Sequence, residues 1–339
     1  MHGLMKNFWS NLPRPFFALA PMADVTDPAF RRMFAKYGKP DVTWTEFVSA
    51  DGLMSPGRDR LIRDLAYTEA ERPIVAQIFG SKPENIEKTA ALVRELGFDG
   101  VDLNMGCPDK NIEKQNSGAA MMKSPKLAQE VIAAAMRGAR MGEEGGIPVS
   151  VKTRVGYNKV ELETWIPAIL AMKPAALTIH ARTRKEMSLV PARWEHVAEV
   201  VEMAKGTGVV IIGNGDVTSM EDGVEKATAS GAAGVMVGRG VFGNPWFFNR
   251  ERSIDEVTFR ERFAVMVEHT ALFLELSGDI KSFAVMKKHY KAYVNGFDHA
   301  KELRVALMDA NSLDEIKTLV AQFAQEHPEL MDKTPKDLV

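Results

Sequence analysis

The chain of 339 residues contains a single cysteine, Cys107, which lies between Gly106 and Pro108. Because glycine and proline interrupt regular structure, this thiol is expected on a loop, where functional residues are common. A thiol with an ordinary pKa of about 8.5 is mostly protonated at neutral pH and can act as a general acid, a role worth about 10²–10⁴-fold in rate. The alternatives are a small buried hydrophobic side chain and a thiolate nucleophile with His180 as its base.

Other polar residues lie at or near the ends of short apolar runs, namely Gln77, Asn104, Lys152, His180 and Asn214. One such residue would be an ordinary structural side chain, but the repetition favours a shared site. Gln77, Asn104 and Lys152 suit the pyrimidine edge of a flavin, which offers alternating donors and acceptors and gains negative charge on reduction. A Schiff-base lysine is the alternative role for Lys152.

Glycine-rich turns follow the last two of these runs, as Asn214-Gly215-Asp216 and Gly238-Arg239-Gly240. Backbone N–H groups in such turns bind phosphate, and barrel enzymes have this site after strands seven and eight. The alternative is that these glycines serve only to form the turns and bind no ligand. The segment 238–243 formally matches G-x-G-x-x-G, but no strand–helix–strand unit with a ribose-binding acid follows, which excludes a Rossmann site. The expected ligand carries a phosphate, which favours FMN.

The elements that position these residues are eight short β-rich runs in the first three quarters of the chain. They are Phe16–Ala20, Val42–Phe47, Ile74–Ile78, Gly100–Asn104, Val149–Lys152, Leu177–His180, Val209–Asn214 and Gly234–Gly238. Helical segments such as Pro83–Leu96 and Pro125–Met141 alternate with them. Apolar strands alternating with helices predict an α/β fold, a TIM (β/α)8 barrel, with a doubly wound open sheet as the alternative. After Arg239 the apolar residues follow helical spacing, which predicts a smaller all-helical C-terminal domain.

Composition limits the class of protein. Charged residues make up 26% and hydrophobic ones 45% of the chain, and no apolar run approaches the ~20 residues that span a bilayer. The segment Met1 to Leu12 lacks the features of a signal peptide, so we expect a cytoplasmic protein without membrane contact. One cysteine excludes an intramolecular disulfide and a multi-cysteine metal site, and no metal site is expected. A net charge of −2 does not by itself favour nucleic acid as a partner.

Taken together, these motifs resemble the tRNA-dihydrouridine synthases, most closely the bacterial B-type subgroup. The matching segments cover nearly the whole chain: Ala20–Asp27 with Phe30-Arg31, Gln77, Asn104–Pro108, Lys152–Arg154, His180–Arg184, Asn214–Asp216, Gly238–Gly240, Lys287–His289, Gly296-Phe297 and Glu302–Arg304. The resemblance implies an FMN enzyme that uses NADPH to reduce uridines in tRNA to 5,6-dihydrouridine. Hydride would pass from FMN to C6, and Cys107 would protonate C5.

The resemblance also implies residue roles. FMN would be bound by Pro21, Met22, Ala23, Gln77, Lys152, His180, Asn214, Gly215, Asp216, Gly238 and Arg239. Substrate or RNA would be bound by Asn104, Arg182, Arg184, Lys287, Lys288 and Lys291. We expect an FMN-binding catalytic barrel over 1–248 and a helical RNA-binding domain over 249–339, with the boundary where the strand rhythm ends, in a monomer that needs no protein partner.

A uridine in folded tRNA must be flipped out to reach a pocket, which requires compensating contacts to the RNA backbone. The segment 281–304 holds six basic and two acidic residues, with Tyr290 and Tyr293 interleaved. The alternative is an ordinary solvated helix face with the tyrosines in a core. Asp109 and the segment Lys185–Pro191 depart from the family pattern, which leaves the target uridine open. Rival functions are another FMN barrel that reduces a small molecule, such as a dihydroorotate or dihydropyrimidine dehydrogenase-like enzyme, and an RNA-binding module whose barrel is vestigial.

Overall fold

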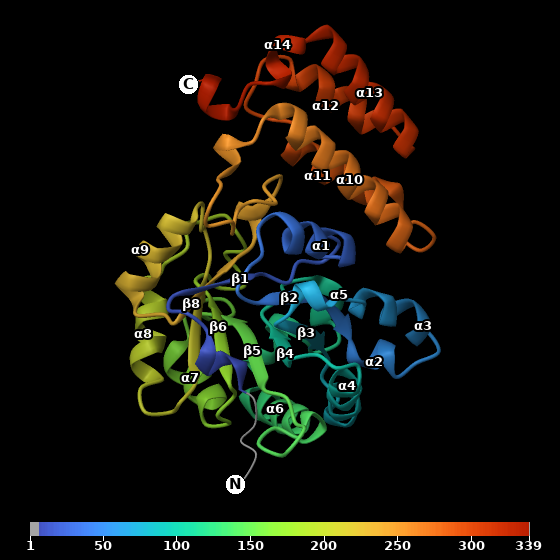
Figure 1. Cartoon of the computed structure of the whole chain (residues 1–339). Helices are drawn as coiled ribbons and strands as arrows, with labels where there is room; N and C mark the ends of the chain where they lie inside the picture. The colour runs from blue at the N-terminus through green and yellow to red at the C-terminus, as the bar shows by residue number, and fades with distance from the viewer. Residues whose placement is uncertain (1–6, 339) are drawn as a thin grey trace. The chain divides into compact units, whose positions relative to one another are not determined.

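The computed structural model describes residues 7–338, so the first half of the segment analysed for a signal peptide lies outside the described residues. The chain divides into two compact units (Figure 1). Unit 1 consists of the chain up to Ala23 and of Asp41–Gly240, and unit 2 consists of Asp24–Pro40 and the chain from Val241 onward. No helix within residues 7–338 is both long and apolar enough to cross a membrane.

Unit 1 is a closed barrel of eight parallel strands, which confirms the predicted TIM barrel. The strands are β1 (Phe16–Leu19), β2 (Thr43–Ser49), β3 (Ile74–Phe79), β4 (Gly100–Met105), β5 (Val149–Arg154), β6 (Ala176–His180), β7 (Val210–Asn214) and β8 (Gly234–Val237). Their order is β1-β8-β7-β6-β5-β4-β3-β2. A parallel bridge between Ala18 of β1 and Val42, the residue just before β2, closes the barrel and excludes the open sheet. The predicted runs match these strands to within one or two residues at each end.

Helices surround the barrel strands in Figure 1. The helices of unit 1 are α2 (Ala50–Leu53), α3 (Arg58–Leu61), α4 (Pro83–Glu95), α5 (Lys110–Glu113), α6 (Pro125–Ala139), α7 (Leu162–Leu170), α8 (Glu195–Met203) and α9 (Met220–Ser230). Short 3-10 turns lie at Phe8–Asn11, Ile62–Leu65, Glu69–Glu71, Gly118–Lys123 and Arg239–Val241. Proline begins both α4 and α6, where its missing N–H would have no partner in any case. The apolar strands are buried almost completely, since barrel side chains cover one face and helices the other.

Gly138 shows how closely two of these helices pack. It lies on α6, and a Cβ added there would approach the carbonyl oxygen of Glu87 on α4 to 2.0 Å. Alanine normally stabilises a helix interior by about 1 kcal/mol over glycine. We predict the opposite sign for Gly138→Ala, a loss of about 1–3 kcal/mol, because the helices must separate. Urea unfolding followed by circular dichroism measures this loss.

The neighbouring Arg137→Ala is the control for this prediction. Arg137 is exposed and forms an ion pair with Glu87 at 2.6 Å, so its removal is expected to cost less than about 1 kcal/mol. A Gly138→Ala protein that is as stable as the wild type would contradict the proposed packing.

Unit 2 is helical and takes one helix from near the N-terminus. Its helices are α1 (Pro28–Tyr37), α10 (Phe259–Ser277), α11 (Lys287–Tyr293), α12 (Ala300–Asp309), α13 (Leu313–Glu326) and α14 (Pro328–Met331), with 3-10 turns at Ile254–Glu256, Phe283–Met286 and Pro335–Leu338. The Asp27 side chain caps α1 by accepting from Phe30 N at 2.9 Å. Tyr290 and Tyr293 are 0% and 2% exposed in the core of this unit. The alternative in which these two tyrosines belong to a core is therefore confirmed.

Candidate active site

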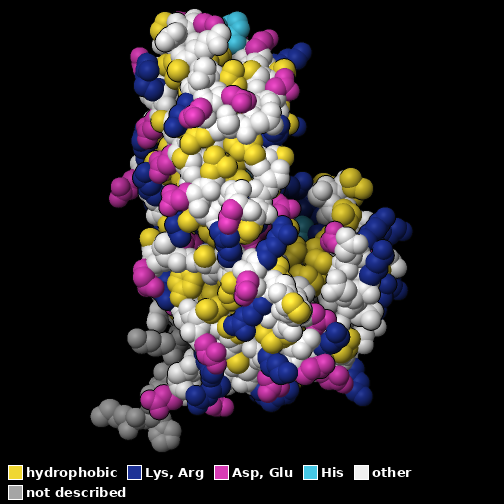
Figure 2. Space-filling model, turned by 90° about the vertical axis from the view of Figure 1, so that its right-hand side faces the viewer, with side chains coloured by type: hydrophobic (Ala, Val, Ile, Leu, Met, Phe, Trp, Pro, Cys, Tyr) yellow, Lys and Arg dark blue, Asp and Glu magenta, His cyan; other side chains and the backbone are white. Residues whose placement is uncertain are grey.

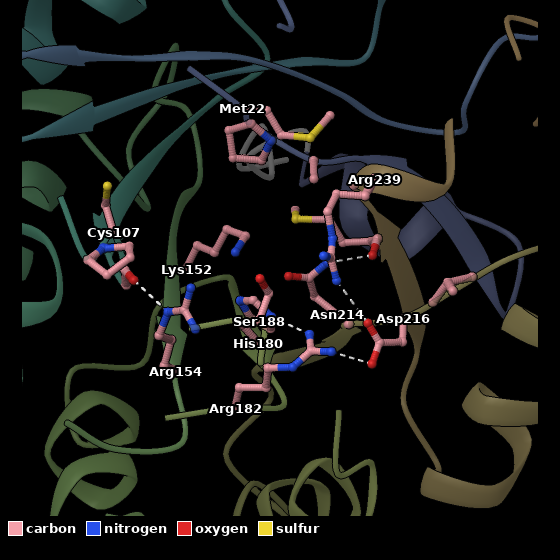
Figure 3. Close-up of a pocket in the computed structure, with 18 of the residues that line it drawn as sticks. Met22, Cys107, Lys152, Arg154, His180, Arg182, Ser188, Asn214, Asp216 and Arg239 are labelled. Atoms are coloured by element: carbon pink, nitrogen blue, oxygen red, sulfur yellow. Dashed lines mark hydrogen bonds and ion pairs between the residues drawn. The ribbon is translucent and has the colours of Figure 1, made fainter. Parts of the chain in front are cut away.

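Unit 1 contains a cavity of about 670 Å³ at the carboxyl ends of its strands. This volume lies in the range of small-molecule and cofactor sites. Of the residues predicted to bind cofactor, those that line it are Pro21, Met22, Gln77, Lys152, His180, Asn214, Gly215, Asp216, Gly238 and Arg239. Cys107, Asn104 and Arg182 line it as well. Figure 3 shows Cys107 on one side, Asp216 and Arg239 on the other, and Lys152 and His180 between them.

Some predicted residues lie elsewhere. Ala23 is exposed and does not line the cavity. The Arg184 guanidinium is held by Glu113 at 2.7 Å and lies 5.2 Å from the centre of the Tyr157 ring. It therefore joins the end of α5 to the loop after β6 and is not part of the cavity wall. Lys287, Lys288 and Lys291 lie on α11, in unit 2.

The Cys107 thiol is presented to the cavity by a turn built on Asn104. The Oδ1 atom of Asn104 accepts from the backbone N–H groups of Gly106 and Cys107, at 3.1 and 2.9 Å. Burial raises the pKa of the thiol, so it is protonated at neutral pH. Cys107 is only partly buried and lines the cavity, unlike a side chain packed in a core. The raised pKa also disfavours the thiolate nucleophile.

A chain of polar side chains crosses the barrel interior below this turn. Asn104 Nδ2 donates to Gln77 Oε1 at 3.0 Å, and Gln77 Nε2 donates to Asp102 at 2.6 Å. Ser150 donates to the other oxygen of Asp102 at 2.5 Å. Burial raises the pKa of Asp102 to about 6, although these hydrogen bonds oppose the shift. The network fixes both carboxamides and leaves each with one N–H for a ligand.

Cations dominate the middle of the cavity. Burial, together with the Arg154 guanidinium, lowers the pKa of Lys152 to about 8. Burial and the same cations lower the pKa of His180 well below its usual value, so the imidazole is neutral. Its Nε2 atom therefore accepts from Arg182 Nη1 at 3.2 Å, because a guanidinium can only donate. The cavity favours an anionic ligand.

The far end of the cavity has the features of a phosphate cradle. Gly215 has φ +133°, and a Cβ there would approach Ala192 Cβ to 2.7 Å, so the turn requires glycine. A Cβ on Gly238 would occupy cavity space beside Met22 Sδ and Ala20 Cβ, at 3.6 and 3.7 Å. Backbone atoms are thus accessible to a ligand at this end. Asp216 pairs with Arg182 and, at 3.1 Å, with the more exposed Arg239.

Arg154 is a cavity residue that the sequence reasoning missed. Its Nε donates to Gly106 O at 2.8 Å, and its Nη1 donates to Thr183 O at 3.2 Å and Met187 O at 3.1 Å. It is only 7% exposed, and burial lowers its pKa to about 10. It joins the Cys107 turn to the loop after β6. The two-residue spacing from Lys152 was the available signal, since alternate residues of a strand share a face.

The described residues do not bring three or more His, Cys, Asp or Glu side chains together as a metal site. On the face drawn in Figure 2, basic and acidic side chains are intermixed over most of the surface, in keeping with the net charge of −2. Any binding of a polyanion must therefore depend on local groups more than on the overall charge.

Comparison with known proteins gives a consistent result. The family model described as "Dihydrouridine synthase (Dus)" matches residues 18–328. The "Probable tRNA-dihydrouridine synthase 2" of Bacillus subtilis (strain 168) is 40% identical over 331 residues, which cover 96% of this chain and 98% of that protein. The "Probable tRNA-dihydrouridine synthase" of Staphylococcus aureus (strain COL) is 40% identical over 333 residues, with the same coverage of the two chains.

Proposed function

The chain belongs to the dihydrouridine synthase family, and from this premise we propose that it reduces specific uridines of tRNA to 5,6-dihydrouridine with bound FMN and with NADPH as co-substrate. The observation that carries this proposal is the convergence of a protonated Cys107, a cationic Lys152 and a glycine-lined phosphate cradle on one cavity. When bound, FMN would supply the hydride that reaches C6 of the uracil ring.

The cavity residues suit FMN in type and position. The glycine turns at Gly215 and Gly238, with Arg239, would hold the phosphate. The remaining N–H of Gln77 and the ammonium of Lys152 would face the pyrimidine edge, where negative charge develops on reduction. Pro21, Met22, His180, Asn214 and Asp216 would complete the wall.

Cys107 would protonate C5 of the uracil. The turn on Asn104 and the bond from Arg154 to the Gly106 carbonyl hold the thiol in place. Burial keeps the proton on sulfur, while the positive charges of Arg154 and Lys152 lower the thiol pKa from the value that burial alone would give. The same cations would stabilise the thiolate left after proton transfer. One remaining N–H of Asn104 would contact the uracil.

RNA contacts outside the cavity would come from basic residues. We assign Lys287, Lys288 and Lys291 of the helical domain and Arg184 of the barrel to these contacts, whereas Arg182, which lines the cavity, would contact the substrate inside it. Catalysis would reside in 1–248 and RNA binding in 249–339, in a cytoplasmic monomer. These contacts would offset the few kcal/mol needed to extrude a uridine from its stack.

The test uses the purified chain with FMN, NADPH and a set of tRNA transcripts made without modification. Nucleoside mass spectrometry is expected to show a uridine that has gained two hydrogens. No gain on any transcript would overturn the proposal. Oxidation of NADPH with a free pyrimidine such as uracil, and not with tRNA, would favour a small-molecule reductase instead.

A further inference from the structure

The loop between β6 and α8 carries apolar side chains in solvent beside the polar cavity. Leu189 is 85% exposed, Met187 42% and Val190 36%. Met187 and Ser188 also line the cavity. An isolated exposed leucine needs no explanation, but three exposed apolar residues among four consecutive ones do. We call the segment 187–190 the apolar loop.

The apolar loop is held firmly by two nearly buried arginines. Arg154 donates to the carbonyl of Met187 at 3.1 Å, and Arg182 donates to the carbonyl of Val190 at 2.6 Å. Arg154 is 7% exposed and Arg182 is 2% exposed. Glu186, just before the loop, accepts from Thr183 N at 2.8 Å and forms an ion pair with Arg193 at 2.8 Å. The exposed position of Leu189 is therefore built into the structure.

Met187 adopts a left-handed backbone conformation, with φ +55°. Residues with long side chains rarely occupy this region, and such residues cluster at functional sites. Here the bond from Arg154 to the Met187 carbonyl helps to hold the turn. Because Arg154 also binds the Gly106 carbonyl, one side chain fixes both the apolar loop and the Cys107 turn. Arg154 thus links the apolar loop directly to the turn that carries the thiol.

We infer that Leu189, supported by Met187, enters the base stack of the RNA and fills the gap left by the flipped uridine. The inference rests on the proposed function, because it requires an RNA base to enter the cavity. Removing a base from a stack exposes the apolar faces of its neighbours, and proteins that unstack bases insert leucine or methionine between them. The loop borders the cavity that would receive the base, so it would lie close to the vacated place.

The test compares Leu189→Ser with wild type, both as full-length holoenzyme. We expect kcat/KM for folded tRNA to fall about tenfold or more, because contact of a side chain with a base face is worth about that much. Reduction of a short oligouridine, which has no stack to open, should fall less than twofold. NADPH oxidation without RNA should not change. Leu189→Phe should retain activity on folded tRNA.

Val224→Ser is the matched control, since Val224 is a 41% exposed apolar residue on α9 that does not line the cavity. It is expected to behave as wild type on both substrates. The inference is overturned if Leu189→Ser reduces folded tRNA at the wild-type rate, or if it loses the same factor on oligouridine. A wild-type protein that reduces no tRNA would instead disprove the proposed function, so the two failures are distinguishable.

Discussion

Cys107→Ala is expected to lose uridine reduction by about 10²–10⁴-fold, the usual contribution of a general acid, while its flavin is still reduced by NADPH. The variant removes the only thiol of the chain and keeps the Cβ atom. The Asn104 turn and the Arg154 bond involve backbone groups, so they persist. Anaerobic stopped-flow measures the bleaching of the flavin, and nucleoside mass spectrometry measures dihydrouridine.

Cys107→Ser is the conservative control for this result. A hydroxyl is close in size to the thiol but is a much weaker acid, so this variant should also be slow on uridine and normal with NADPH. Dihydrouridine formation by Cys107→Ala within tenfold of wild type would disprove the acid role. Loss of flavin or of folding in both variants would show that the cysteine is structural.

Lys152→Met is expected to slow NADPH-dependent flavin reduction by about 10²-fold, the effect of removing one preorganised electrostatic partner. The pKa of Lys152 is lowered to about 8, so the ammonium is charged below that pH and neutral above it. For wild type, FMN affinity should therefore begin to decline as the pH rises through about 8, and flavin reduction should decline at a higher pH, because the bound anion raises the pKa of the ammonium. The variant should lack this titration.

Although Lys152→Met should slow flavin reduction, it should stabilise the apoprotein. Because folding lowers the pKa of Lys152 from 10.5 to about 8, the buried charge destabilises the fold at pH 7. The stability contribution of the neutral amine is present above the unfolded pKa and is lost as the pH falls through about 8. Lys152→Met should consequently melt at a higher temperature than wild type at pH 7, and this difference should shrink toward pH 10.5.

Lys126→Met, at an exposed lysine on α6, is the control for both measurements and should match wild type in each. A Lys152→Met protein with wild-type flavin affinity, reduction rate and pH profile would show that the ammonium does not act on the flavin. Unchanged melting at pH 7 would show that the charge is well solvated in the apoprotein.

The sequence by itself determined the barrel and most of the cavity wall. Parallel strands that are buried on both faces produce continuous apolar runs such as Val209–Ile212. Such a run can be recognised in the sequence without knowing which strands lie beside it. In a (β/α)8 barrel the carboxyl ends of all strands meet at one rim, so strand order alone brings Gln77, Lys152 and Asn214 together. Turn glycines such as Gly215 can also be recognised in the sequence, because a positive φ is a local requirement of the backbone.

Only the tertiary structure decided which charged and aromatic side chains serve the site. Arg154 binds the carbonyl of Gly106, 48 residues away, and the loop after β6, so the strand period that places it on the same face as Lys152 does not reveal these partners. Arg184, predicted to contact RNA, pairs with Glu113, 71 residues away. The membership of Asp24–Pro40 in the helical unit likewise depends on contacts with a distant part of the chain. Periodicity records which face of an element is buried, whereas hydrogen bonds and ion pairs depend on distances between segments that only the folded chain defines.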